Sequence, residues 1–324
     1  MRFLIFLPFV LGLGTAAGCA APQSVARATF PDASARASTA CQKADAMWND
    51  KIVPTRYGSL PPLTSPGILD LLTLASTSFT IRSLTNDGDE LDAGHRKLVH
   101  AFGAEARFRW VPSKAEHGYS GIFQSGADCI IGRLSMATKP SRTSAVPALA
   151  LKIFLTGHQS VNLHVMNSTD GQKSHNFFEM PFSNIIPPPD SFAKRMLQEL
   201  FRKAAVAFGA KDPAPTHLTL EHLAGIRLDG TPAAAVKSPF RLIFQPTTAA
   251  RAFMEGATVQ TDFRSNLSGF PVGQAMYEVY AFDEGEPFAD PAAGKHVGQL
   301  VTTSGIVASS YGDEKLNFQH NMSR

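Results

Sequence analysis

The chain has 324 residues, of which 44% are hydrophobic and 18% are charged. That length is sufficient for one large globular domain or two ordinary ones, with a substantial apolar core. The formal net charge is only +3, and the lysines and arginines are spread along the chain, so the composition argues against a nucleic-acid partner.

The N-terminal residues have the pattern of a secretory signal peptide. Met and Arg are followed by an apolar run over residues 3–13, which is too short to span a membrane. Ala-Gly-Cys at residues 17–19 resembles a bacterial lipobox, although Ala16 stands where Leu is usual. We expect residues 1–18 to be removed and Cys19 to carry a lipid that tethers an exported lipoprotein to the bacterial cell envelope, facing the periplasm. Plain secretion is the alternative.

Residues 19–50 are expected to form a lipid-anchored or flexible tether, because the stretch after Cys19 is rich in Ala, Ser, Thr, Arg and Pro. Residues 51–324 then form a single domain. Two further cysteines, Cys41 and Cys129, lie far apart in the sequence. In an exported protein such a pair either forms one disulfide or remains as two buried thiols, and the spacing alone does not decide between them.

The first predicted elements are a helix and a series of strands. Ser65 and Pro66 are a typical helix start, with apolar residues following. A short segment that begins at Arg96 then places His100 at the start of a long predicted strand. Side chains along this strand alternate in type up to Val111, with one aromatic face. Shorter strand-like runs follow at residues 119–124, 129–136, 148–156 and 161–166.

A second helix and a second set of strands complete the pattern. Three prolines at 187–189 end the first set, and an amphipathic helix is predicted from Ser191 to Gly209. Strand-like runs resume at residues 240–245, 257–263, 275–282, 296–307 and 316–320. The pattern predicts an α+β fold, a large antiparallel β-barrel with interrupting and flanking α-helices, closed so that no strand edge is exposed.

Several catalytic motifs are absent from the sequence. It contains no H-E-x-x-H zinc motif, no P-loop and no G-x-G-x-x-G, and the glycine–serine segments at Ser120 and Ser160 do not fit G-x-S-x-G. His217 and His222 are five residues apart, so on a helix their rings point about 140° apart. A metal-binding pair is therefore not expected there.

Four segments resemble the haem-dependent catalases, and they occur in the family's order within residues 95–205. RKLVHAFGA at Arg96–Ala104 resembles R-x-V-H-A-x-G, Arg133–Ser135 resembles R-F-S, Pro147–Phe154 resembles P-x-G-x-A-V-K-F, and Asn176–Phe178 with the prolines after it resembles F-F-x-x-x-x-x-F-P. The C-terminal part is more similar to the smaller, divergent catalase-like proteins than to true catalases.

The resemblance implies a catalase-like barrel whose interior holds haem b and which acts on hydrogen peroxide or on organic or fatty-acid hydroperoxides. His100 is then the distal residue that takes a proton from the peroxide and returns it to the leaving oxygen. Ser135 orients His100, and Arg133 pairs with a haem propionate. Arg96 is a further cofactor-binding candidate.

Phe177 and Phe178 complete the implied haem pocket as its apolar wall. Each implied residue also has a structural interpretation: His100 and Ser135 are satisfied by the backbone, Arg133 lies in a surface ion pair, and the two phenylalanines lie in the core. The metal ligand is unknown. The family binds iron through a tyrosine phenolate with an arginine four residues earlier, and none of the five tyrosines here has that arginine.

Two main hypotheses follow from the sequence. The first is a catalase-related haem oxidoreductase of the peroxidase type, and the second is a haem-free barrel with a binding or structural role in the envelope. An unrelated barrel lipoprotein that carries a lipid is a third. Because catalase-like proteins are often oligomers, a homo-oligomer is a further expectation.

Overall fold

The computed structural model describes residues 39–51, 102–136, 147–155, 160–167, 176–185, 191–193, 196, 216–225, 236–255, 263–287, 290–308, 316 and 318. The chain divides into two units, Met1–Arg36 and Ala37–Arg324, and all described residues belong to the second. Among these residues, no helix is both long and apolar enough to cross a membrane.

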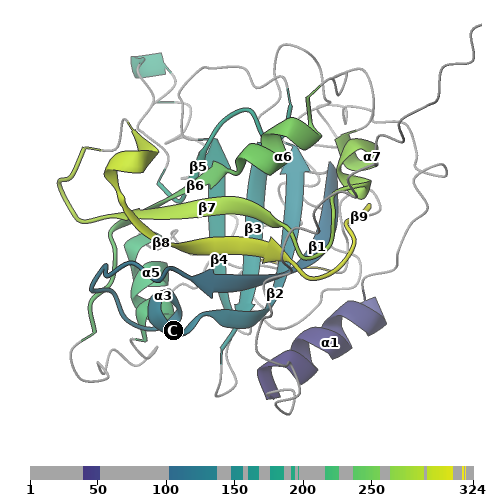
Figure 1. The fold of residues 1–324 in the computed structure, drawn as a ribbon, viewed down its shortest axis with the longest axis horizontal. Helices are drawn as coiled ribbons and strands as arrows, with labels where there is room; N and C mark the ends of the chain where they lie inside the picture. Colours follow the sequence, from purple (N-terminus) through teal and green to yellow (C-terminus); the bar gives the residue numbers. More distant parts are fainter. Residues whose placement is uncertain are drawn as a thin grey trace, which may run out of the picture. The chain divides into compact units, whose positions relative to one another are not determined.

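In the part of the chain that the structure describes, eight antiparallel strands close into a barrel (Figure 1). Strands β2 to β8 pair in chain order, and β1 closes the ring by pairing with both β2 and β8. A short β9 adds beside β1 at Ala104 and Glu105. The bounds are β1 Phe102–Pro112, β2 Ala127–Met136, β3 Pro147–Phe154, β4 Ser160–Asn167, β5 Phe182–Ser183, β6 Arg241–Pro246, β7 Ala275–Phe282, β8 Lys295–Thr302 and β9 Val307–Ala308. The predicted antiparallel barrel is confirmed.

The length of β1 is what allows closure. Its residues from Phe102 onward pair with β2, and its last five, Phe108–Pro112, pair with β8. A strand in a closed barrel is tilted and staggered, so one long strand can serve two partners at different heights. A register irregularity between Phe108 and Trp110 in the β1–β2 pairing marks the place where β1 turns from one partner toward the other.

The barrel interior is filled by apolar and aromatic side chains. On β1 the inward residues are Ala104, Ala106, Phe108 and Trp110, all at most 1% exposed. Trp110 meets the rings of Phe123 and Phe244 edge-on, at centroid distances of 5.7 and 6.0 Å. Such aromatic pairs add stability beyond the area that they bury. The interior is therefore a packed core.

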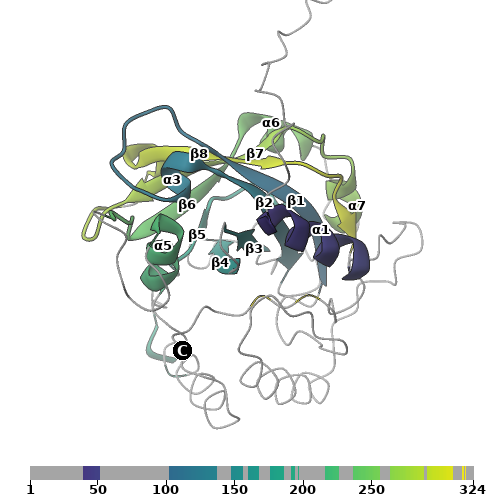
Figure 2. The ribbon, with the colours of Figure 1, turned by 90° about the horizontal axis from the view of Figure 1, so that it is seen from below.

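A second apolar cluster lies outside the barrel. It contains Ala44, Met47, Cys129, Ile131, Phe154, Leu316 and Phe318. Helix α1, Thr39–Lys51, packs against the outer side of β2 and β3 (Figure 2). The Cys41–Cys129 disulfide joins α1 to β2 with 5.1 Å between the two Cα atoms, and Asp45 of α1 forms an ion pair with Arg107. The two cysteines are thus bonded, and a helix occupies the end of the stretch expected as a tether.

The other described helices are short. They are α3 Ile122–Ser125, α5 Thr216–Ala224, α6 Thr248–Phe253, α7 Phe263–Ser268 and the 3-10 turn η2 Pro291–Ala293. The prediction of a strand over residues 119–124 was wrong, because α3 stands there between Gly121 and Gly126. Both glycines have positive φ angles, 67° and 76°, which turn the chain too sharply for a strand.

Other predicted elements differ from the structure in detail or fall outside it. The run at 296–307 is divided between β8 and β9, and Phe263 begins α7 rather than ending a strand. The predicted helix at Ser65 lies outside the described residues, as does most of the helix expected from Ser191.

Candidate functional site

The structure describes four of the residues that the catalase resemblance singles out. These are Arg133, Ser135, Phe177 and Phe178. His100, Arg96 and Cys19 lie outside the described residues.

Arg133 and Ser135 lie on the outer face of the barrel. Along β2, Ile130 and Leu134 belong to the interior core, whereas Ile131 belongs to the outer cluster beneath α1. Because side chains alternate along a strand, Arg133 and Ser135 share the outward face of Ile131. Both are only 3% exposed. Both side chains therefore face away from the barrel interior.

Other polar side chains are buried on the same outer face of neighbouring strands. Glu105 on β1 is 2% exposed, Lys152 on β3 is 0% and Asn162 on β4 is 1%. Glu105 is the register partner of Arg133, and Lys152 is the register partner of Asn162. We call Glu105, Arg133, Ser135, Lys152 and Asn162 the buried polar face. Its burial means that its charges must be balanced within the protein.

Glu105 balances the charge of Arg133. The Arg133 Nε atom lies 3.8 Å from Glu105 Oε1. The guanidinium extends over Gly103, where an added Cβ would lie 2.6 Å from the Arg133 Cζ atom. Ser135 is the register partner of Gly103. The small residue three positions after His100 thus makes room for the protein's own guanidinium.

Phe177 and Phe178 lie on the other side of the barrel wall, in the interior. Both are 0% exposed and belong to the core cluster. The Phe177 ring stacks on Phe263 with centroids 6.0 Å apart, and the Phe178 ring meets Tyr277 at 5.8 Å. Both rings are therefore part of the packed core. The structure does not bring these rings together with Arg133 and Ser135.

The three described tyrosines, Tyr119, Tyr277 and Tyr280, all have raised pKa values. Burial raises the pKa of Tyr277 well above its ordinary value, and its hydroxyl has no hydrogen-bond partner among the described residues. Burial, with a bond to Asp283, raises the pKa of Tyr119. Burial, with the charge of Glu278, raises the pKa of Tyr280.

The described residues include Arg133, the implied partner of a haem propionate. Arg133 already has a carboxylate partner, and a propionate placed beside it would be repelled by Glu105. In the same part of the chain, no group of three or more His, Cys, Asp and Glu residues is placed to hold a metal ion.

His217 and His222 both lie on α5, where burial lowers the pKa of His222.

A first cluster that the sequence did not reveal gathers around Asp283, which follows β7. Asp283 accepts hydrogen bonds from the Tyr119 hydroxyl at 2.9 Å and from Lys295 Nζ at 2.6 Å, and Lys237 Nζ lies 3.7 Å away. The hydrogen bond from Lys295 lowers the pKa of Asp283. His117 stacks on the Tyr119 ring with centroids 5.7 Å apart. These contacts tie the loop before α3 to the β7–β8 turn.

A small pocket lies in the same region of the chain. Its volume is about 240 Å³, and it is lined by Glu221, Ser238, Pro239, Phe240 and Glu284. Its walls come from α5, from the segment before β6 and from the turn after β7. None of the polar side chains among these lining residues is strongly buried, so the pocket by itself does not indicate a ligand or a reaction.

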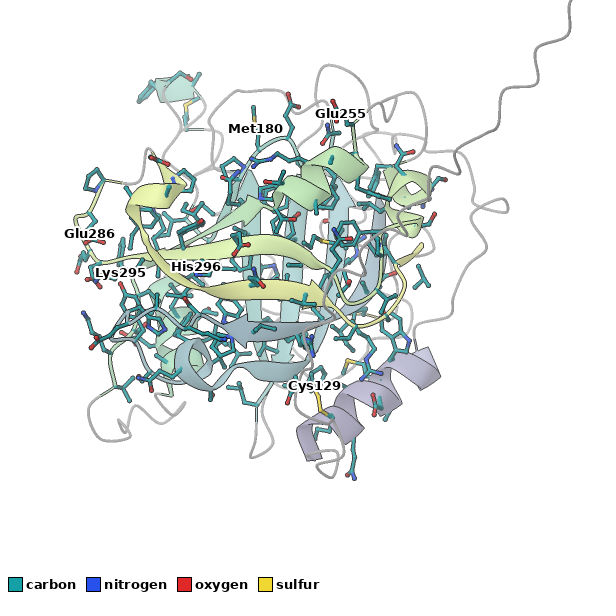
Figure 3. The ribbon with its side chains drawn as sticks, in the orientation of Figure 1. Cys129, Met180, Glu255, Glu286, Lys295 and His296 are labelled. Atoms are coloured by element: carbon teal, nitrogen blue, oxygen red, sulfur yellow. A yellow bond between two sulfur atoms is a disulfide. The ribbon has the colours of Figure 1, made fainter. Side chains whose placement is uncertain are left out.

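A second missed cluster joins Ser113, His296 and Glu278. Ser113 Oγ lies 2.9 Å from His296 Nδ1, and His296 Nε2 lies 2.7 Å from Glu278 Oε2. Ser113 follows β1, His296 is on β8 and Glu278 is on β7 (Figure 3 labels His296 beside Lys295). The serine and the histidine are 183 residues apart, and no local motif marks either of them. Only the barrel topology brings them together.

Neither the family models nor the curated proteins with which the chain was compared match it.

Proposed function

We propose that the chain is a catalase-like barrel protein of the bacterial envelope that works without haem, in a binding or structural role. The observation that carries the proposal is the Arg133–Glu105 ion pair, at 3.8 Å between two side chains that are each 3% exposed. The arginine that the resemblance assigns to a haem propionate already has an internal carboxylate. The packed interior, with Phe177 and Phe178 in it, supports the same conclusion.

Export to the envelope is part of the proposal. The Cys41–Cys129 disulfide supports it, because structural disulfides persist in oxidising compartments and are rare in the cytosol. The N-terminal leader and the lipobox-like Ala-Gly-Cys support lipidation at Cys19. Membrane attachment then occurs through the lipid. Replacing Cys19 with Ala is expected to move the protein from the membrane fraction to the soluble fraction, and an unchanged membrane fraction would contradict the anchor.

A haem-dependent enzyme that acts on hydrogen peroxide or an organic hydroperoxide is the second candidate. It is favoured by the burial of Arg133 and Ser135 on one face, the two residue types that the resemblance places beside a distal histidine. In that candidate His100 supplies acid–base catalysis. A fatty-acid hydroperoxide is a substrate class equally open to it.

The absorption spectrum of the full chain, produced with haem supplied, separates the two candidates. The haem-free proposal predicts no Soret band after purification. A band of one haem per chain, with peroxide reactivity that His100→Ala abolishes while haem stays bound, would establish the second candidate. A matched His217→Ala variant controls for the loss of a histidine elsewhere.

A further inference from the structure

The hydrogen-bonded series Ser113–His296–Glu278 has the connectivity of a nucleophile, a base and a carboxylate that orients the base. Each link is within hydrogen-bond distance, 2.9 Å from serine to histidine and 2.7 Å from histidine to glutamate. Gln299 donates from Nε2 to the other Glu278 oxygen at 2.8 Å, which fixes the carboxylate. The geometry of such triads, rather than their order in the chain, is what identifies them.

The direction of the hydrogen bonds suits proton removal from Ser113. A carboxylate only accepts, so His296 Nε2 carries the hydrogen that Glu278 receives. In the neutral ring the other nitrogen, Nδ1, is then an acceptor, and the Ser113 hydroxyl donates to it. The backbone N–H of Ala115 also donates to Ser113 Oγ, at 3.1 Å, and so favours negative charge on that oxygen.

A local irregularity of the β7–β8 pair aims His296 at Glu278. His296 and Gln299 are three residues apart, and in a regular strand they would point to opposite faces. The register shifts between Val279 and Tyr280, and Gly298 has a φ of 150°, so both side chains reach the same carboxylate. Bulges of this kind re-aim side chains and are common beside active sites.

The three side chains are accessible to solvent. The side chains of His296 and Glu278 are 33% and 28% exposed, and Ser113 is partly buried. The Tyr280 ring packs against the imidazole with centroids 5.4 Å apart, which gives the site one apolar wall. A small ligand can therefore reach the serine without any strand moving.

We infer that Ser113, His296 and Glu278 form a nucleophilic hydrolase site for small carboxylic esters. Ser113 Oγ bonds to the ester carbonyl carbon while its proton moves to His296 Nδ1. The bond to the alkoxide then breaks, and the alkoxide leaves as an alcohol with that proton. Water attacks the acyl-serine and gives a proton to Nδ1, which returns it to Ser113 Oγ as the carboxylic acid leaves. Glu278 stabilises the imidazolium in both steps.

The test is covalent labelling of the purified full-length chain with a fluorophosphonate. In this reaction the serine oxygen bonds to phosphorus and fluoride leaves. One label per chain is expected, on the peptide that contains Ser113. Ser113→Ala should remove that label, and the matched Ser125→Ala variant should retain it, because Ser125 bonds only to backbone carbonyls near its own helix.

The remaining variants separate a reactive site from a static hydrogen-bond network. His296→Gln should slow labelling by roughly 100-fold or more, the usual contribution of a general base, and Glu278→Gln by about 10-fold or more. Hydrolysis of p-nitrophenyl acetate should follow the same order, with circular dichroism confirming that each variant is folded. A folded wild-type chain that leaves Ser113 unlabelled, or equal labelling in His296→Gln, would overturn the inference.

Discussion

Two polar regions on the outer side of the same barrel contain similar groups and differ in burial. On β1–β4 the side chains of Glu105 and Arg133 are each 3% exposed and lie on the side of the barrel that α1 packs against. On β7–β8 the side chains of His296 and Glu278 are 33% and 28% exposed. Because the protein covers Glu105 and Arg133, they form an internal ion pair. His296 and Glu278 remain accessible to solvent and to small molecules. The difference shows that residue type alone does not decide which polar cluster is available for chemistry.

The energetic consequences of the two regions differ in the same way. Removing one partner of a buried ion pair leaves an uncompensated charge, which typically costs about 3–5 kcal/mol. An exposed pair contributes only about 0–1 kcal/mol, because water and salt screen it. Substitutions should therefore damage folding on β1–β4 and damage chemistry on β7–β8.

The largest effect is expected from removing the disulfide that holds α1 over β2. The bridge joins cysteines 88 residues apart, and closing a loop of that length stabilises the fold by about 4–5 kcal/mol in the chain-entropy model. Cys41→Ala/Cys129→Ala should lower the free energy of unfolding by that order. Hydrogen exchange should show lost protection in α1 and β2 and unchanged protection in β7 and β8. Equal loss in all four elements would contradict the separation of the two regions.

The next effect is expected at the buried ion pair. Glu105→Gln leaves the Arg133 charge buried without its carboxylate, so the free energy of unfolding should fall by about 3 kcal/mol. The matched substitution Glu278→Gln, on the exposed region, should cost less than about 1 kcal/mol. Urea denaturation of both variants measures the contrast. Equal destabilisation would show that burial does not distinguish the two carboxylates.

A smaller effect is expected at Gly298, whose backbone conformation in β8 allows the His296 side chain to reach Glu278. Gly298→Ala places a methyl group about 2.7 Å from Trp110 Nε1 at a φ of 150°, so the strain should cost roughly 1–3 kcal/mol. Gly305→Ala is the matched control, because a Cβ there meets no atom within 4 Å. Thermal unfolding and the NMR signal of the His296 ring N–H report the two consequences. A stable variant with that signal unchanged would contradict the role of the bulge.

The smallest effect is a pH dependence of stability at the Asp283 cluster. The hydrogen bond from Lys295 holds the pKa of Asp283 below its ordinary value in the folded state. Its contribution is therefore present above the ordinary aspartate pKa and is lost as the pH falls through the lower folded value. Solvent keeps the contribution below about 1 kcal/mol. In Asp283→Asn, the loss of unfolding free energy at acid pH should be smaller than in wild type by that amount. An identical loss in wild type and variant would contradict this contribution.

Much of the barrel could be predicted from the sequence, because period-2 alternation reports directly on which side chains face a core. The run at residues 275–282 coincides with β7, and the run at 161–166 lies within β4. The failure at 119–124 has a local cause. Gly121 and Gly126, both with positive φ angles, turn the chain at the two ends of Ile122–Ser125, and the residues between them form a short helix.

The functional residues were less predictable, since their meaning depends on pairing across the barrel. Arg133 and Ser135 were identified by type, but the partner of Arg133 is Glu105, which only the β1–β2 register reveals. His296 and Glu278 lie 18 residues apart, and a bulge determines their contact. No local pattern encodes that shift.

Titration of the full-length chain with haem, followed by absorption in the Soret region, tests whether the protein works without haem. Wild type should be compared with Glu105→Gln/Arg133→Met, in which both charges are removed so that neither is left buried alone. No saturable band is expected in either protein, because Arg133 is already paired with Glu105. A band that saturates at one haem per chain in wild type and is lost in the double variant would contradict this expectation.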